Sequence, residues 1–98
     1  MITVKQARGI ADAYVSSIAN GSEPLEIIDS ATISRPYGWM FFYQSSRYLE
    51  TNDPTAMLAG NAPFIVNSAT SLITVTGTAE STEYYLSQYE ASHGTGAA

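Results

Sequence analysis

The amino-acid sequence predicts an α+β fold. We expect a four-stranded, mainly antiparallel sheet, with N-terminal and C-terminal helices packed on one face and a short helix between strands 2 and 3. Two observations support this: apolar residues recur at helical spacing near both ends of the chain, and strand-like segments cluster between them. With 98 residues, 45% of them hydrophobic, the chain has the size and composition of one globular domain. We place this domain at residues 1–92 and a patternless, disordered tail at residues 93–98.

The N-terminal helix is predicted over residues 4–20. Thr3 and Gln6 have the spacing of a capping box, in which each side chain satisfies a backbone N–H at the helix start. Gly21 can adopt the left-handed conformation that ends a helix. One apolar stripe at helical spacing is formed by Ala7, Ile10, Ala11, Tyr14, Val15 and Ile18.

The first two strands are predicted to form an antiparallel pair. Leu25 to Ile33 is interpreted as the first strand, and Arg35-Pro36-Tyr37-Gly38 as the turn that follows it. The stretch from Gly38 to Glu50 then begins with large aromatic and apolar residues, which favour strands. Successive strand residues face opposite sides, and both sides begin apolar here, so we expect a central strand. One row holds Trp39, Phe41 and Tyr43, and the other holds Met40, Phe42 and Gln44.

The second half of the chain supplies the remaining elements. Asp53 can cap a short helix and Pro54 can occupy its first position, so we predict this helix at residues 55–59. Strands are expected at Phe64–Asn67 and Leu72–Thr76, joined as a hairpin by residues 68–71. Ser81 can cap the C-terminal helix, whose apolar members are Tyr84, Tyr85, Leu86 and Tyr89.

The sequence contains no recognisable catalytic or metal-binding pattern, so we expect neither an enzyme nor a bound cofactor or metal. The absence of Cys excludes disulfides, thiol nucleophiles and zinc–thiolate sites. The single His, His93, falls in the expected tail, whereas a general base must be held in place. Glu50 and Asp53 are close in sequence, but at a turn they are better explained as surface and capping residues than as a glycosidase pair. No calcium loop or phosphate loop occurs.

Charge and hydropathy narrow the range of partners. The formal net charge is −5, with only four basic residues, so nucleic acid is not an expected partner. The N-terminus has no signal-peptide pattern, and no apolar run is long enough to cross a bilayer, so we expect a cytoplasmic protein without a membrane partner. The acidity could attract a basic partner or serve only solubility. Likewise, Tyr37, Tyr48, Tyr84 and Tyr85 are expected to be partly exposed, either at an interface or at the core edge.

The second half of the sequence resembles the immunity protein 35 family, small YrhB-like bacterial domains encoded beside polymorphic toxins. The resemblance covers about residues 37–89, and an N-terminal helix is also in place. One departure is Ser71, which stands where the family hairpin carries Gly and implies a different turn or strain of about 1 kcal/mol. The motifs that carry the resemblance are Gly38-Trp39 followed by aromatics, Tyr48-Leu49-Glu50-Thr51, Ala59-Gly60-Asn61-Ala62-Pro63, a hairpin, and Gly77-Thr78 before the last helix.

This resemblance implies a non-enzymatic immunity protein that binds and neutralises a cognate bacterial toxin. The alternative is a small chaperone-like holdase or stress protein. We expect the toxin interface at residues near the ends of the central strand, where side chains leave the core. These residues are Tyr37, Arg47, Tyr48, Glu50 and Asp53.

Overall fold

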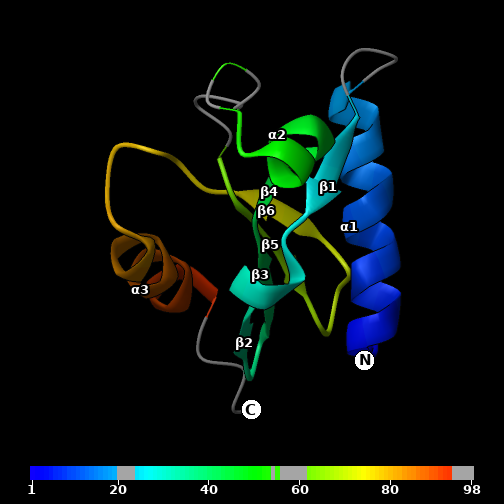
Figure 1. Ribbon diagram of the computed structural model, residues 1–98. Helices are drawn as coiled ribbons and strands as arrows, with labels where there is room; N and C mark the ends of the chain where they lie inside the picture. The colour runs from blue at the N-terminus through cyan, green and yellow to red at the C-terminus, as the bar shows by residue number, and fades with distance from the viewer. Residues whose placement is uncertain (20–23, 54, 56–61, 94–98) are drawn as a thin grey trace.

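The computed structural model describes residues 1–19, 24–53, 55 and 62–93 (Figure 1). Its class is α+β, and the expected four-stranded antiparallel sheet is confirmed, with strand order β2-β3-β5-β6. A separate two-stranded sheet pairs β1 with β4. In chain order the elements are α1 (Val4–Ala19), β1 (Leu25–Ile27), the 3₁₀ turn η1 (Asp29–Ala31), β2 (Ile33–Arg35), β3 (Gly38–Phe41), β4 (Tyr43–Ser45), α2 (Ser46–Thr51), β5 (Phe64–Asn67), β6 (Ile73–Val75) and α3 (Thr82–His93).

The first two predicted strands do form an antiparallel pair, but both are interrupted. Ile27 lies opposite Tyr43, and Ile33 lies opposite Met40, so residues 28–32 face only residues 41–42. The surplus residues form η1, which replaces the continuous strand expected from Leu25 to Ile33. The prediction of one unbroken strand was wrong because the alternation of side chains shows which residues favour a sheet but not where extra residues leave the ladder.

The two long helices cover opposite faces of the sheet, so the expectation that both pack on one face is wrong (Figure 1). On one face, Phe41, Phe64 and Val66 form a cluster with Ala7, Ala11 and Val15 of α1. On the other face, Met40 and Ile65 pack with Leu86 and Tyr89 of α3. The physical reason is that β3 and β5 carry apolar side chains on both faces, and each face must be removed from water.

The start of α1 agrees with its sequence signal. The Thr3 N–H donates to Gln6 Oε1 (2.8 Å), and the Gln6 N–H donates to Thr3 Oγ1 (3.2 Å), which is a capping box. The helix ends at Ala19, and the rest of the predicted helix end lies outside the described residues. Small residues at the buried face let α1 approach the sheet closely, and Tyr14 packs edge-on against Phe64 with ring centroids 4.6 Å apart.

A short helix does come before the third predicted strand, but it occupies the last residues of the stretch Gly38 to Glu50, which was expected to be strand, and not the predicted residues 55–59. It is α2, in which the Tyr48 N–H donates to Ser45 Oγ (3.0 Å), so Ser45 is the N-cap residue. Asn52, with φ of 56°, ends it in the left-handed conformation. The helix predicted at residues 55–59 lies outside the described residues except for Thr55.

The β5–β6 hairpin has the predicted position, and Ser71 has the unusual backbone that the departure from the family pattern implied. Its φ is 65°, in the left-handed region. Asn67 compensates, because its Oδ1 accepts the Ala69 N–H (2.8 Å) and the Thr70 N–H (3.0 Å) and so holds the turn together. The hairpin therefore forms without the usual glycine.

The connection into α3 is held by side chains. The Tyr84 N–H donates to Ser81 Oγ (3.2 Å), which confirms Ser81 as the cap. The Tyr85 hydroxyl oxygen accepts the N–H groups of Ala79 (3.2 Å) and Glu80 (3.1 Å), which fastens the β6–α3 loop to the helix. The tail was predicted at residues 93–98, but His93 is the last residue of α3, and residues 94–98 lie outside the described part. The domain limits of 1–92 stay a prediction.

The fold predicts a strong effect of Gly38→Ala. Gly38 has a φ of 152°, and a Cβ there would lie 2.1 Å from the Val66 carbonyl oxygen. We expect the free energy of unfolding to fall by about 3 kcal/mol, through backbone strain and overpacking. Chemical denaturation measures this.

Gly9→Ala is the matched control. Gly9 lies in α1, and a Cβ there would meet no atom within 4 Å. This change should stabilise the protein by about 0.5–1 kcal/mol, because alanine has the higher helix propensity. Equal effects of the two substitutions would contradict the close approach of β3 to β5.

Candidate functional site

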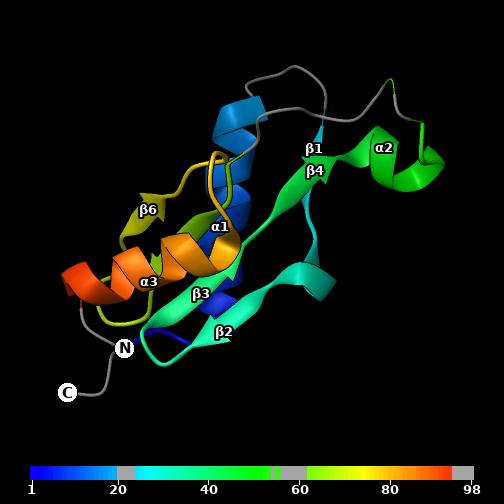
Figure 2. The same cartoon turned by 90° about the vertical axis from the view of Figure 1, so that its left-hand side faces the viewer.

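Four of the five predicted interface residues lie on or just after α2. This helix stands at the outer end of an arm, formed by β1, β4 and α2, that extends away from the four-stranded sheet (Figure 2). Arg47 and Glu50 are exposed, and Tyr48 and Asp53 are half-buried. Together with the exposed Leu49, they form a mixed charged, aromatic and apolar patch, which we call the α2 surface. Such a mixture is typical of protein interfaces.

The opposite charges of the α2 surface form only a weak ion pair. Arg47 Nη2 lies 4.0 Å from Asp53 Oδ2, and the side chains are 62% and 38% exposed, so water screens the attraction. The Thr55 hydroxyl and N–H both donate to Asp53 Oδ1, at 2.8 and 3.0 Å. These hydrogen bonds, more than the charge of Arg47, lower the pKa of Asp53 below its ordinary value. Both charges therefore remain available to a partner.

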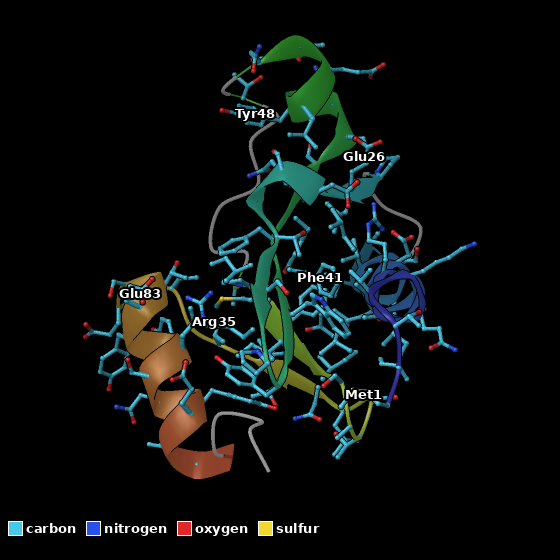
Figure 3. All side chains as sticks on the ribbon, turned by 90° about the horizontal axis from the view of Figure 1, so that it is seen from below. Met1, Glu26, Arg35, Phe41, Tyr48 and Glu83 are labelled. Carbon is cyan, nitrogen blue, oxygen red and sulfur yellow. The ribbon has the colours of Figure 1, made fainter. Side chains whose placement is uncertain are left out.

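Tyr37, the fifth predicted residue, does not belong to this patch. It lies in the β2–β3 turn, two residues after Arg35, which Figure 3 shows well away from Tyr48. Its side chain is only 4% exposed, so the expectation of partial exposure is wrong. The ring stacks on Tyr89 of α3, with centroids 5.0 Å apart, and the hydroxyl donates to Glu90 Oε2 (3.0 Å). Tyr37 is thus a core residue that fixes α3 to the sheet.

Burial is also the main reason why the pKa of Tyr37 is raised from 10.0 to about 12. The hydrogen bond to the Glu90 carboxylate adds to this effect, because it favours the neutral phenol. The shift follows from packing and needs no catalytic explanation.

A cavity that the sequence analysis did not identify lies between the start of α1 and η1. Its volume is about 290 Å³, and it is lined by Val4, Lys5, Arg8, Asp29, Thr32 and Phe41. Figure 3 shows Phe41 on the side of the sheet that faces α1. The Arg8 guanidinium donates to Asp29 (Nε to Oδ1, 2.7 Å) and also contacts Asp12. The Arg8–Asp12 spacing of four residues was the one available sequence signal.

This cavity does not offer an evident general base. The hydrogen bond from Arg8 lowers the pKa of Asp29, so the carboxylate is a weak base. The Thr32 hydroxyl is buried and has no hydrogen-bond partner among the described residues. The Arg8–Asp29 pair instead links α1 to η1. Within the described ranges, no group of three His, Cys, Asp or Glu side chains could hold a metal ion, and no helix is long and apolar enough to cross a membrane.

Comparison with known proteins gives two findings. The model of a family described as immunity protein 35 matches residues 5–92 of this chain. The chain is also 45% identical over 90 residues to the uncharacterized protein YrhB of Escherichia coli K12, covering 92% of this chain and 90% of that protein. No solved structure matches it.

The environment of Tyr37 predicts a pH-dependent stability. Because the folded-state pKa is raised to about 12, the stabilisation is complete below pH 10.0 and is lost as the pH rises toward 12. Tyr37→Phe should cost about 1–2 kcal/mol at neutral pH, and this difference from the wild type should shrink across the same pH interval. Denaturant unfolding at several pH values measures both effects.

Tyr84→Phe is the control, because the Tyr84 side chain is exposed. It should change the free energy of unfolding by no more than a few tenths of a kcal/mol. A Tyr37→Phe variant whose stability falls with alkaline pH as steeply as that of the wild type would contradict the assignment.

Proposed function

Because the chain belongs to the immunity protein 35 family, we propose that it is an immunity protein that binds a cognate bacterial toxin and neutralises it. The observation that carries this proposal is the extent of the family match. Residues 5–92 include every described strand and all but one residue of each long helix, so the match is to the whole fold and not to a shared fragment. The proposed action is non-enzymatic inhibition in the bacterial cytoplasm, directed at a toxin of a polymorphic toxin system.

The α2 surface is the proposed contact with the toxin. It combines the exposed charges of Arg47 and Glu50 with the half-buried ring of Tyr48, and Asp53 lies beside them. Tyrosine and arginine contribute strongly to binding at interfaces, because they join a large contact area to hydrogen-bonding groups. The end of the arm is also accessible, since it projects from the body of the protein (Figure 2). Tyr37 is left out of this proposal because it is buried.

Electrostatics support a partner that is basic at its contact surface. With a formal net charge of −5, the protein attracts a positively charged domain and speeds their encounter. The displaced pKa values of Tyr37, Asp29 and Asp53 all have structural causes in packing, an ion pair and a turn. A binding role accounts for these groups without any catalytic function.

Calorimetric titration with the toxin domain encoded by the neighbouring gene tests the proposal. We expect saturable binding with nanomolar affinity and loss of toxin activity in the complex. A folded toxin domain that neither binds nor loses activity would disprove this pairing. Weak binding to many unfolded proteins, with suppression of their aggregation, would instead favour a chaperone-like holdase.

Substitutions on α2 test the proposed contact surface. Arg47→Glu and Tyr48→Ala should each weaken toxin binding by about tenfold or more, as expected for residues central to an interface. Lys5→Glu makes the same charge change at the exposed start of α1, which lies at the other end of the molecule from α2 (Figure 1), and should leave the affinity nearly unchanged. Equal affinities of all three variants and the wild type would place the interface elsewhere.

A further inference from the structure

β6 is an edge strand whose outer backbone groups are unpaired in the described part of the chain. The Asn67 N–H donates to the Leu72 carbonyl (3.0 Å), and the Thr76 N–H donates to the Pro63 carbonyl (2.9 Å). Residues 72, 74 and 76 therefore direct their backbone groups toward β5, and Ile73 and Val75 direct theirs outward, because the direction alternates along a strand. Figure 2 shows β6 at the margin of the sheet with no element beyond it.

The opposite edge of the same sheet is protected, and β6 is not. On β2, Ser34 is the residue whose backbone groups face outward, since Ile33 and Arg35 face the hydrogen-bonding positions of β3. The Arg35 guanidinium donates to the Ser34 carbonyl (3.1 Å), and Pro36 follows directly. Charged side chains and proline are the usual means of blocking an edge. Residues 72–76 contain neither, and the side chains of Leu72 and Val75 are 67% and 52% exposed.

A groove adjoins the open edge of β6. Its volume is about 220 Å³, which is room for a side chain of moderate size, and it lies between β6 and α3. Its lining has hydroxyl, amide and aromatic groups but no charge, and consists of Thr74, Val75, Thr76, Tyr85, Gln88, Tyr89 and Ser92. A strand paired with β6 directs every second side chain to one face of the sheet, so one of these would enter the groove.

Charge distinguishes between the possible occupants of this edge. All four basic residues of the chain lie in its first 47 residues, so β5, β6 and α3 carry none. The β6–α3 connection and α3 carry Glu80, Glu83 and Glu90. A second copy of the chain would bring two such acidic regions together and is opposed electrostatically, whereas a basic segment is attracted.

We propose that β6 accepts an extended, positively charged segment of the partner protein, which adds a fifth strand to the four-stranded sheet. The backbone groups of Ile73 and Val75 supply the hydrogen bonds, and the groove between β6 and α3 takes an uncharged side chain. Lysine or arginine residues two positions before or after that side chain lie on the same face of the sheet, and the negative charge of Glu80, Glu83 and Glu90 attracts them. This inference rests on the proposed function, because it takes the partner to be the toxin.

The β6 contact and the α2 surface lie on opposite sides of the molecule (Figure 2). The longest dimension of the protein is 44 Å, which about 13 residues of extended chain can span. A toxin domain placed on α2 can therefore reach β6 with such a segment.

Val75→Pro is the test substitution. It removes an outward N–H without removing a hydrogen bond between β5 and β6, because the Val75 backbone faces away from β5. We expect affinity for the toxin domain to fall roughly tenfold. Ser34→Pro makes the same change at an outward-facing position on β2 and should alter the affinity by no more than about twofold.

Amide hydrogen exchange of the unmodified protein provides a measurement that does not depend on how well the variants fold. The Ile73 and Val75 amides should exchange rapidly in the free protein and become protected in the complex, while the Ser34 amide stays unprotected. The strand-addition proposal is overturned if Val75→Pro binds the toxin with the wild-type affinity and the Ile73 and Val75 amides of the unmodified protein stay unprotected in the complex. The immunity function would still stand.

A peptide probe tests the edge when the toxin domain fails to bind at all, an outcome that would contradict the proposed function. The probe is a short synthetic peptide of alternating valine and threonine with lysine at each end, compared with its glutamate-ended counterpart. Protection of Ile73 and Val75 by the lysine-ended peptide alone would support a basic strand at β6. Protection by neither peptide, or pairing of β6 with a second copy at increasing protein concentration, would overturn the proposal.

Discussion

The structure depends on the burial of β5 from both sides. Phe64, Ile65 and Val66 are each 0% exposed, although they point alternately to the two faces of the sheet. A single helix cannot cover both faces, so α1 and α3 enclose the sheet between them. Gly38 is required by the same arrangement, because β3 approaches the β5 backbone too closely for any side chain at that position.

The surfaces available for binding are those that this three-layer core leaves open. The antiparallel hairpin that begins in the sheet continues past η1 as the arm, where Ile27 of β1 and Tyr43 of β4 still pack on α1, and it carries α2 at its end. At the other margin, the chain turns from β6 directly into the loop before α3, so no further strand among the described residues covers that edge. Tyr85 and Ser81 fix this loop on the helix and so maintain the groove beside β6. The core provides rigidity, and its margins provide contact surfaces.

The predicted interface residues form two groups: those whose position depends on neighbouring residues in the sequence, and one whose position depends on distant contacts. Arg47, Tyr48 and Glu50 lie in one turn of helix, and Asp53 follows closely, so proximity in sequence was enough to group them. Tyr37 was grouped with them as a residue near the end of the same strand. Its burial depends on Tyr89 and Glu90, more than fifty residues away, and no local pattern shows such a contact. The cavity beside Arg8 was missed for the same reason, since α1 and η1 meet only in the folded chain.

The sequence alone determined the α+β class, the antiparallel pairing and the starts of the two long helices, because capping residues, turns and apolar periodicity act over a few neighbouring residues. It also contained a sign of coverage on both faces, since Trp39 to Phe42 is apolar on both sides. Only the tertiary structure decided which helix lies on which face, where η1 interrupts the hairpin, and which edge stays open. These features depend on contacts between distant segments. The burial of apolar surface stabilises such contacts, but the local sequence does not show which segments will meet.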